Sequence, residues 1–375
     1  MNAARILAGM QIGIDARLLA YRTGGISTYI TQLLRALATL HTDYEFVAFK
    51  SRKAKQSLDA PGMRIGTLWT PCHHRIERTA LSVELARFRL DVLHSPDFIP
   101  PRRGARRHVI TVHDLTFLHY PQHLTAESRR YYNDQIDAAV KHADHILTDS
   151  IASRDDMVSM LGVPADKISV HRLGIDARFQ PQSEGELSRV RKQWNLPQSY
   201  FLFVGTFEPR KNIIGLVDAY GLLRGRNPTA PPLVIAGSRG WLYEETIAHI
   251  EQAGLGNSVV VRENLPTEDL PGLYGNALAL ITPSFYEGFG LPALEAMACG
   301  TLPIVSNRSS LPEVVGSVGA LVEPENVDSI ASALERALLD ESWRAEQRTA
   351  GLARAATFRW EDTARVALSA YTRVL

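Results

Sequence analysis

The chain has 375 residues, of which 45% are hydrophobic, enough material for two or three domains with substantial cores. Its 41 lysines and arginines nearly balance its 40 aspartates and glutamates, so no overall field favours a nucleic-acid partner. The two cysteines, Cys72 and Cys299, cannot form a disulfide framework, which favours a reducing, cytoplasmic setting. We expect no signal peptide and no spanning helix, because neither a basic leader with an apolar core nor a window of about 18 apolar residues is evident.

Strands and helices alternate through the first half of the chain. The apolar residues of 26–39 recur at helical spacing, and short apolar runs on either side are typical of strands. We predict strands within 11–19, 44–49, 91–95, 108–114, 145–150 and 168–176, and helices at 26–39, 81–88 and 126–142. Such alternation favours a parallel sheet with helices on both faces.

The alternation begins again after residues 180–197, a polar stretch with proline and glycine that we interpret as a linker. In the second half we predict strands at 200–206, 232–237, 258–264, 277–282 and 301–306, and helices at 212–223, 244–253, 268–277, 293–298 and 360–375. The pattern predicts two α/β domains, residues 1–180 and 181–358, followed by an amphipathic terminal helix within 359–375.

Residues 284–300, SFYEGFGLPALEAMACG, carry the most informative motif. They follow the apolar run at 277–282, and the order is strand, glycine-rich loop and helix. Ligands of parallel α/β sheets bind at the carboxyl ends of the strands, and glycines beside a helix start let backbone amides approach an anion. We therefore expect Glu287 to lie in the loop over a ligand. Glu295 would lie about one helical turn further, facing the same cleft.

Two adjacent cations follow the first strand of the second half, in the segment FVGTFEPRKN. Gly205 ends the strand, Arg210 and Lys211 follow, and a helix begins at Asn212. Cations are disfavoured at a helix start, whereas a planar guanidinium and a compact ammonium suit a diphosphate. The alternative is a solvated charge pair. No Asp-x-Asp sequence occurs in the chain, so we expect these fixed cations to take the place of a divalent metal.

The string EGFGLPALEAMACG with its two glutamates eight positions apart resembles the signature of retaining glycosyltransferases of family 4. The resemblance covers nearly the whole chain and is strongest over 200–323. It implies the α/β GT-B fold, with two Rossmann-like doubly wound domains facing across a cleft and a C-terminal helix crossing back to the first domain. It also implies that Glu287 contacts the donor sugar, that Glu295 holds the ribose, and that Arg210 and Lys211 hold the diphosphate. No divalent metal or other cofactor is then required.

The resemblance adds further donor-site residues and a weaker acceptor side. Beside the diphosphate and the base it places backbone at Gly24, Gly25, Gly205, Gly237, Arg262, Asn264, Leu265, Gly288, Phe289, Gly290 and Leu291. A plain turn is the alternative for Gly24 and Gly25. His113, at a strand end in TVHDLTF, would lie by the donor sugar, although it could equally be a satisfied polar residue. His94, Asp97 and Asp114 are acceptor-side candidates.

The predicted function is transfer of a hexose from a nucleotide-sugar to a glycan or lipid-linked saccharide in surface-polysaccharide biosynthesis. The segment IAGSRGWLYEE, residues 235–245, resembles bacterial mannosyl- and rhamnosyltransferases, which favours mannose from GDP-mannose. The alternatives are a UDP- or ADP-sugar donor, a nucleotide-sugar epimerase of the same architecture, and a non-enzymatic two-lobed binding protein. A dinucleotide oxidoreductase is disfavoured, because YRTGGIS after the first strand lacks G-x-G-x-x-G.

Four arginines cluster in one loop-like stretch, at Arg102, Arg103, Arg106 and Arg107. One interpretation is a solvated loop. The other is contact with anionic lipid headgroups or a lipid diphosphate, since basic clusters near a membrane attract anionic surfaces. With the resemblance, this predicts a cytoplasmic enzyme in peripheral contact with the inner face of the cell membrane.

Overall fold

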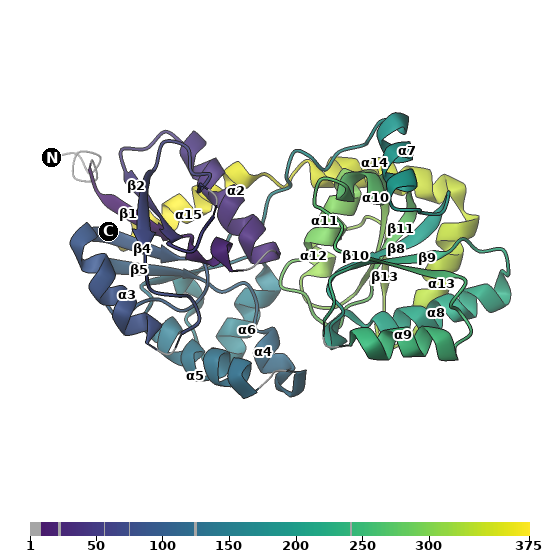
Figure 1. The fold of residues 1–375 in the computed structure, drawn as a ribbon, viewed down its shortest axis with the longest axis horizontal. Helices are drawn as coiled ribbons and strands as arrows, with labels where there is room; N and C mark the ends of the chain where they lie inside the picture. The colour runs from purple at the N-terminus through teal and green to yellow at the C-terminus, as the bar shows by residue number, and fades with distance from the viewer. Residues whose placement is uncertain (1–8, 22–23, 56, 75, 124–125, 241) are drawn as a thin grey trace. The chain divides into compact units, whose positions relative to one another are not determined.

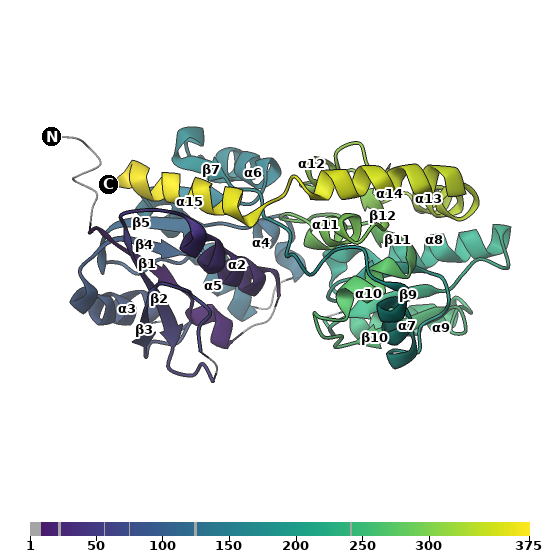
Figure 2. The same cartoon turned by 90° about the horizontal axis from the view of Figure 1, so that it is seen from above.

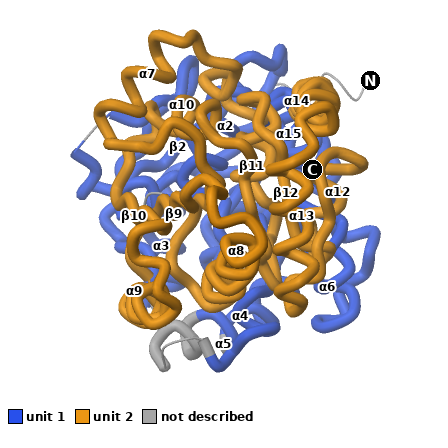
Figure 3. Tube along the Cα trace, turned by 90° about the vertical axis from the view of Figure 1, so that its right-hand side faces the viewer, with its two compact units in different colours: residues 1–174, 359–375 blue, residues 175–358 orange. Residues whose placement is uncertain are grey.

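A computed structural model describes residues 9–21, 24–55, 57–74, 76–123, 126–240 and 242–375. The chain divides into two compact units, coloured separately in Figure 3. Unit 1 joins Met1–Gly174 to the C-terminal segment Arg359–Leu375, and unit 2 is Ile175–Phe358. The first boundary therefore lies at 174/175, before the expected 180/181. Among the described residues, no helix combines the length and apolar character that crossing a bilayer requires.

Unit 1 is built on a seven-stranded sheet in the order β3-β2-β1-β4-β5-β6-β7, and all its strand pairs are parallel. Its strands are β1 (Gln11–Asp15), β2 (Glu45–Ser51), β3 (Arg64–Leu68), β4 (Leu90–Ser95), β5 (Ala105–Thr111), β6 (His145–Thr148) and β7 (Ile168–Val170). Its helices are η1 (Arg17–Ala20), α2 (Gly25–Thr39), α3 (Glu77–Leu85), η2 (Ala86–Phe88), α4 (Thr116–His119), η3 (Pro121–His123), α5 (Ala126–His142), α6 (Ile151–Leu161), η4 (Ala165–Lys167) and α15 (Trp360–Val374).

The C-terminal helix α15 completes unit 1, as the predicted fold class requires. It packs beside α2 and against β5, β6 and β7 (Figure 2, yellow against purple). The apolar spacing that predicted α2 is the reason for this packing, since its buried side chains include Tyr29, Leu33 and Leu37. At the chain crossing, Gly174 lies so close to Trp360 that a Cβ atom would sit 2.2 Å from the Trp360 amide nitrogen. Only glycine permits that approach.

Unit 2 is built on a six-stranded parallel sheet in the order β10-β9-β8-β11-β12-β13 (Figure 1). Its strands are β8 (Tyr200–Val204), β9 (Leu233–Gly237), β10 (Val259–Glu263), β11 (Ala277–Thr282), β12 (Leu302–Ser306) and β13 (Ala320–Val322). Its helices are α7 (Glu184–Gln193), η5 (Pro209–Lys211), α8 (Ile213–Arg226), α9 (Tyr243–Gln252), α10 (Leu270–Gly275), α11 (Leu291–Ala298), α12 (Leu311–Val315), α13 (Val327–Leu339) and α14 (Glu341–Ala355).

The interpretation of residues 180–197 as a linker is wrong. Helix α7 occupies much of that stretch and packs on α10 within unit 2. Ser183 caps its start by accepting from the amide of Glu186, and Val190 is buried. The polar composition belongs to a surface helix whose first turn is acidic and whose last turn is basic, which suits the helix dipole. The sequence interpretation also missed strands β3 and β13 and helices α4, α6, α12, α13 and α14.

Each sheet reverses its strand succession at one place. In unit 1 the order runs outward on both sides of the neighbours β1 and β4, and in unit 2 it does so on both sides of β8 and β11. In open α/β sheets the loops at such a switch point diverge to opposite faces and leave a crevice at the strand ends. The carboxyl ends of β1 and β4, and those of β8 and β11, are therefore the places to look for chemistry.

Candidate active site

Three of the predicted catalytic side chains meet at the switch point of unit 2. Arg210 and Lys211 lie in η5 after β8, and Glu287 lies in the loop after β11. The Lys211 Nζ lies 2.5 Å from Glu287 Oε1, and the Arg210 Nη1 lies 2.9 Å from Glu287 Oε2. Ser284 Oγ donates to the same carboxylate at 2.7 Å. The structure thus brings one anion and two cations into a single buried cluster.

Asn212 holds the two loops of this cluster together. It adopts a left-handed backbone, with φ at 55°, immediately before α8. Its side-chain amide donates to the carbonyls of Pro283 at 3.2 Å and Pro324 at 2.6 Å. The amide of Phe285 also donates to the carbonyl of Arg210 at 2.8 Å. The loop after β8 is therefore fixed directly to the loop after β11. These backbone contacts hold the charged side chains close together.

The charge state of Glu287 follows from its neighbours. Burial alone would raise its pKa, but the adjacent Lys211 and Arg210 outweigh burial and hold the pKa at about 2. The carboxylate is therefore ionised at neutral pH and can only accept hydrogen bonds. Arg210 also donates through Nε to Glu208 at 2.9 Å. Both cations are consequently neutralised by carboxylates of unit 2 in the described structure.

The glycine-rich loop between Glu287 and α11 is held in one conformation. Ser310 Oγ lies 2.8 Å from the carbonyl oxygens of Glu287 and Phe289 and shares its one proton between them. Phe289 is buried, and its ring packs edge-on against Phe358. Gly290 has a φ of 102° and immediately precedes α11, a backbone that a side chain would strain. The predicted residues Gly288, Phe289, Gly290 and Leu291 therefore form one rigid turn that leads into a helix N-terminus.

Glu295 lies one turn into α11, as predicted, and is partly buried. Tyr274 Oη donates to its Oε2 at 2.7 Å. Burial raises the pKa of Glu295 to about 7, because no cation near it offsets the cost of burying its charge to the extent that Lys211 does for Glu287. The two glutamates of the motif thus differ in charge state: Glu287 is permanently ionised, whereas Glu295 titrates near neutral pH.

The residues expected around a nucleotide base lie at or just after the ends of β8, β9 and β10, and the side chain of Arg262 also has a structural role. A Cβ atom on Gly237 would lie 1.8 Å from the Gly205 carbonyl oxygen, so the close approach of two strand ends requires this glycine. Asn264 and Leu265 follow β10, and Asn264 has a φ of 55°. The Arg262 guanidinium donates to the backbone after α7, at Trp194 (2.7 Å) and Asn195 (2.8 Å). It anchors that turn within unit 2.

In unit 1, both ring nitrogens of His113 are engaged. Nδ1 lies 2.7 Å from Asp149 Oδ2, and Nε2 lies 2.9 Å from the Pro96 carbonyl oxygen. A carbonyl can only accept, and Asp149 is a carboxylate, so both nitrogens donate and the ring is an imidazolium. Burial alone would lower the pKa of His113, but Asp149 raises it to about 9. Asp149 also accepts from His171 at 3.1 Å. In this structure both polar atoms of His113 are hydrogen-bonded to other residues of unit 1.

One acceptor-side candidate, His94, is placed differently from expectation, and the acceptor role of Asp114 stays a prediction. His94 is fully buried, and its ring bonds Thr111 Oγ1 at 2.8 Å and Tyr371 Oη at 2.7 Å. It therefore ties α15 to the sheet and does not line a surface. Asp114 accepts from the amide of Thr116 at 2.9 Å at the start of α4. His94 lies near the end of β4 as predicted, whereas β5 ends at Thr111 and Asp114 lies in the loop that follows it.

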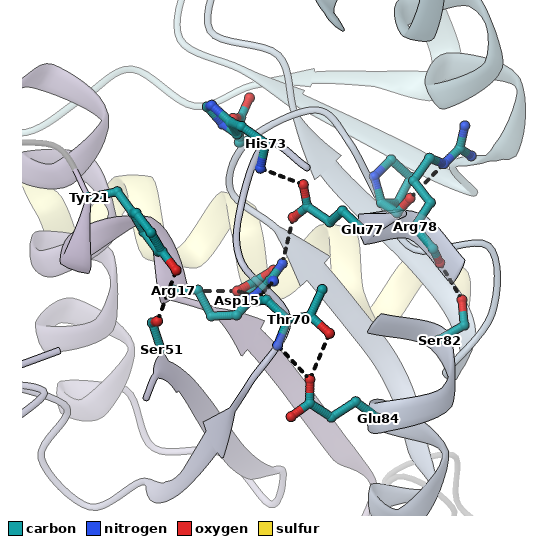
Figure 4. A network of polar contacts seen from close by, with 12 residues as sticks. Asp15, Arg17, Tyr21, Ser51, Thr70, His73, Glu77, Arg78, Ser82 and Glu84 are labelled. Atoms are coloured by element: carbon teal, nitrogen blue, oxygen red, sulfur yellow. Dashed lines mark hydrogen bonds and ion pairs between the residues drawn. The ribbon is translucent and has the colours of Figure 1, made fainter. Parts of the chain in front are cut away.

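The third acceptor-side candidate, Asp97, lines a small hollow, open to solvent, at the switch point of unit 1. Sequence reasoning missed Arg17, a buried charged residue that also lines this hollow (Figure 4). Arg17 is 1% exposed and donates to both oxygens of Asp15, at 2.8 and 2.7 Å, and to Glu77 Oε1 at 2.8 Å. Its remaining bond, at 2.7 Å, goes to the Thr70 carbonyl. An arginine two positions after a strand-ending aspartate was the available signal.

The described residues contain no group of three or more His, Cys, Asp or Glu side chains arranged to hold a metal ion. The expectation of metal-independent chemistry stays a prediction, which chelation tests directly. Gly24, with a φ of 146°, and Gly25 begin α2 as expected for an anion-binding turn. Their contact with a phosphate is also a prediction.

Comparisons with known proteins agree with this arrangement. Residues 186–354 match the family model "Glycosyl transferases group 1", and residues 23–179 match "Glycosyltransferase Family 4". The chain is 38% identical over 281 residues to the O-antigen chain mannosyltransferase B of Escherichia coli, which covers 75% of this chain and 74% of that protein. It is 32% identical over 251 residues to the serotype-specific mannosyltransferase WbdA of Escherichia coli, covering 66% of this chain but only 31% of that longer relative.

Among solved structures, sucrose-phosphate synthase from Thermosynechococcus elongatus is similar in fold, with a TM-score of 0.79 and 23% identity over 97% of this chain and 98% of that one. At that identity the likeness concerns the fold alone. It confirms the predicted architecture of two Rossmann-like units.

Proposed function

The chain belongs to glycosyltransferase family 4, and from this premise we propose that it transfers mannose from GDP-mannose, with retention of configuration, to a glycan or lipid-linked saccharide in surface-polysaccharide assembly. Support for mannose comes from the O-antigen mannosyltransferase that covers 75% of the chain. The observation that carries the proposal is the buried cluster of Arg210, Lys211 and Glu287 at the switch point of unit 2, where the fold places ligands.

The two cations of this cluster would hold the donor diphosphate. In the described structure, Glu287 and Glu208 neutralise them. A diphosphate that pairs with Arg210 and Lys211 would free the ionised Glu287 to accept hydrogen bonds from hydroxyls of the donor sugar. The cations would also stabilise the charge that develops on the diphosphate as the glycosidic bond breaks, which is the contribution usually made by a divalent metal. We therefore propose that transfer needs no metal.

Glu295 and the turn before α11 complete the proposed donor site. The amides between Gly288 and Leu291 point from a helix N-terminus, which favours a negatively charged group. Glu295 accepts a hydrogen bond from Tyr274 and titrates near neutral pH. In its ionised form it would accept hydrogen bonds from both hydroxyls of the ribose. The base would lie against the backbone around Gly237 and Asn264.

Calorimetry tests the donor directly. GDP, GDP-mannose, UDP-glucose and ADP-glucose are titrated into the full chain with and without EDTA. Tight binding of GDP-mannose that EDTA leaves unchanged is the expected result. Preference for UDP-glucose or ADP-glucose would keep the transferase and refute the donor, and a loss of binding in EDTA would refute metal independence. Absence of binding by every nucleotide would remove the proposed roles of Arg210, Lys211 and Glu287.

We also propose that unit 1 touches the membrane peripherally, through a surface called here the α3 face. It is defined by three exposed apolar side chains and five exposed basic ones, namely Trp69, Ile76 and Val83 with Arg52, Lys53, Arg87, Arg102 and Arg103. The apolar members are 65%, 60% and 76% exposed. The arginine cluster predicted from the sequence contributes only in part, since Arg106 pairs with Asp91 at 3.1 Å and Arg107 with Asp144 at 3.0 Å.

Contacts around helix α3 bring several members of this face together. Glu84 of α3 accepts from the amides of Trp69 and Thr70, and the Arg52 guanidinium lies 4.5 Å from the centre of the Trp69 ring. The amide of Arg103 donates to Ser82 Oγ at 3.0 Å on the same helix. Apolar side chains set among cations suit the boundary of an anionic bilayer, where they enter the headgroup layer while the cations remain at its surface.

Vesicle flotation tests this part of the proposal. The full chain should float with vesicles that contain about one-fifth phosphatidylglycerol and much less with pure phosphatidylcholine. The double variant Trp69→Ser and Val83→Ser should lose most of the flotation, whereas Leu339→Ser, which removes a comparably exposed apolar side chain from unit 2, should not. Equal flotation of the double variant and the native chain would refute the α3 face as the contact.

A further inference from the structure

We propose that Tyr274 is a positioning residue for the nucleotide, because its buried hydroxyl holds one oxygen of Glu295 in place and favours the carboxylate form of that side chain. The inference rests on the proposed function, which assigns Glu295 to the ribose of the donor. It goes further by naming the group that sets how strongly nucleotide binding depends on pH. In this proposal Tyr274 acts only through Glu295.

One neutral donor holds the Glu295 carboxylate. Tyr274 is fully buried, and its Oη donates to Glu295 Oε2 at 2.7 Å. Among the described residues, this is the one hydrogen bond that the carboxylate accepts. Glu287, by contrast, is held by two cations and a hydroxyl. A neutral donor orients a carboxylate without cancelling its charge, so the ionised Glu295 keeps its other oxygen and its charge for a ligand.

Other titratable groups near Glu295 do not replace this hydrogen bond. Burial raises the pKa of Glu295, and the hydrogen bond from Tyr274 is the largest effect that lowers it. Asp176 raises this pKa and Arg178 lowers it, and these two residues pair with each other at 3.1 Å. Burial raises the pKa of the Cys299 thiol and of the Tyr274 phenol, so both keep their protons. The ionisation of Glu295 therefore depends mainly on its burial and on the Tyr274 hydroxyl.

Helix α10 holds the tyrosine in a fixed position. It packs against α7 and against α11, the helix that carries Glu295 (Figure 1). Thr301 Oγ1 donates to the carbonyl of Tyr274 at 2.7 Å. Tyr200 Oη donates to the carbonyl of the preceding residue, Leu273, also at 2.7 Å. The backbone of the donor is thus fixed by two hydrogen bonds, and the hydroxyl fixes the carboxylate in turn.

The expected effect has the size of one hydrogen bond to a charged group. Its removal should raise the pKa of Glu295 by about one unit, from about 7 to about 8. At pH 6 the ionised fraction would then be about tenfold smaller than in the native chain, whereas at pH 9 both forms would be almost fully ionised. The loss of nucleotide affinity should therefore be largest in acid and disappear in alkali.

GDP binding to Tyr274→Phe tests this dependence. Calorimetry on the full chain between pH 6 and pH 9 gives the ratio of native to variant association constants, in which the titration of the diphosphate itself cancels. The ratio should fall from about tenfold at pH 6 to near one at pH 9. A ratio near one at every pH would overturn the proposal. An equal deficit at every pH would also overturn it, because that is the result of a merely structural role.

Two further variants separate positioning from packing, with circular dichroism as the check on folding. Tyr200→Phe removes another fully buried tyrosine hydroxyl, one that bonds the backbone of α10, and its ratio should not depend on pH. In a Glu295→Gln background, Tyr274→Phe should change GDP affinity by the same factor at every pH, because no carboxylate remains to titrate. A ratio that varies with pH in either case would overturn the role given to Tyr274.

Titration of the Glu295 carboxyl group without nucleotide separates this inference from the proposed function. Its carbon-13 NMR signal, assigned by its loss in Glu295→Gln, should titrate about one pH unit higher in Tyr274→Phe than in the native chain. If GDP does not bind, the proposed function fails, and the NMR signal still decides whether Tyr274 favours the carboxylate. If GDP binds and the signal titrates equally in both proteins, the proposed function stands and this inference fails.

Discussion

The two units have similar sheet topologies, but the charged groups at their switch points have opposite signs. In unit 2, the anion Glu287 lies between the cations Arg210 and Lys211 at the β8–β11 switch point. In unit 1, the cation Arg17 lies between the anions Asp15 and Glu77 at the β1–β4 switch point. Each centre buries one charge and surrounds it with two of the opposite sign. In unit 2, Glu208 also pairs with Arg210 at 2.9 Å, so the cluster contains a second carboxylate. Fold sets the place of each site, and a few side chains after the strand ends set its chemistry.

The largest expected effect comes from removing the central charge of unit 1. Arg17→Met would leave Asp15 and Glu77 facing each other in a buried site, and breaking a buried pair in this way costs about 3–5 kcal/mol of unfolding free energy. Urea denaturation followed by circular dichroism measures the loss. Arg35→Met removes an exposed arginine that pairs with Asp59 and should cost about 1 kcal/mol or less. Similar losses for both variants would contradict the central position given to Arg17.

In unit 2, removing one of the surrounding cations should act on turnover. Lys211→Ala is expected to lower kcat for mannose transfer on the order of 100- to 1,000-fold, because one of two fixed charges on the leaving diphosphate is lost. Lys192→Ala, an exposed lysine at the end of α7, serves as the control and should retain native turnover. A folded Lys211→Ala enzyme with a native rate would show that the cation cluster has no catalytic role.

A smaller effect should be confined to the core of unit 1. Tyr371→Phe removes the hydroxyl that bonds buried His94, and leaving that ring nitrogen unpaired costs roughly 1–3 kcal/mol. Hydrogen exchange should show lower protection of β4 and β5 amides, with the amides of β8 and β11 unchanged. Loss of protection in both sheets would contradict this expectation and show that the stabilities of the two cores are coupled.

The smallest effect distinguishes the two motif glutamates by pH. The pKa of Glu295 is about 7, so its ionised fraction rises about tenfold between pH 6 and pH 8, whereas Glu287, with a pKa of about 2, stays ionised throughout. If ribose binds the ionised form of Glu295, GDP affinity should increase with pH over this range, by at most about tenfold. Calorimetry at several pH values measures the increase, and Glu295→Gln should abolish it. A flat profile in the native enzyme would refute ribose binding by Glu295.

Sequence patterns predicted the parallel α/β class, the inner strands of both sheets and the residues of the unit 2 cluster, but not the edge strands β3 and β13. Alternating apolar segments predicted the parallel architecture, and the loop motif predicted that Glu287 follows a buried strand and precedes a helix. The partners of each charge were not predictable in the same way. Nothing local in the sequence indicates that Lys211 contacts Glu287, or that Arg17 contacts Glu77, because these pairs depend on which strands become neighbours.

The errors have similar physical causes. His94 ends a strand, which suggested a ligand contact, but a tyrosine near the C-terminus occupies its free nitrogen. The backbone at Arg262 stays a predicted base contact, while its guanidinium binds carbonyls after α7 in the stretch that was wrongly interpreted as a linker. In both cases a long side chain is satisfied by backbone or side chains distant in sequence. Burial of α7 depends on α10, so polarity alone indicated a linker.

The place of α15 in unit 1 affects the order in which the protein matures on the ribosome. Translation normally lets the first-made domain of a chain fold first. Here the whole of residues 175–358 is synthesised before Thr363 and Tyr371, which bond Arg172 and His94 of unit 1. Unit 2 can therefore finish before the domain that precedes it, while the nascent unit 1 keeps the surface that α15 covers on β5, β6 and α2 exposed. Termination of translation between residues 358 and 363 would leave a complete unit 2 attached to an unfinished unit 1, which we expect to be prone to aggregation.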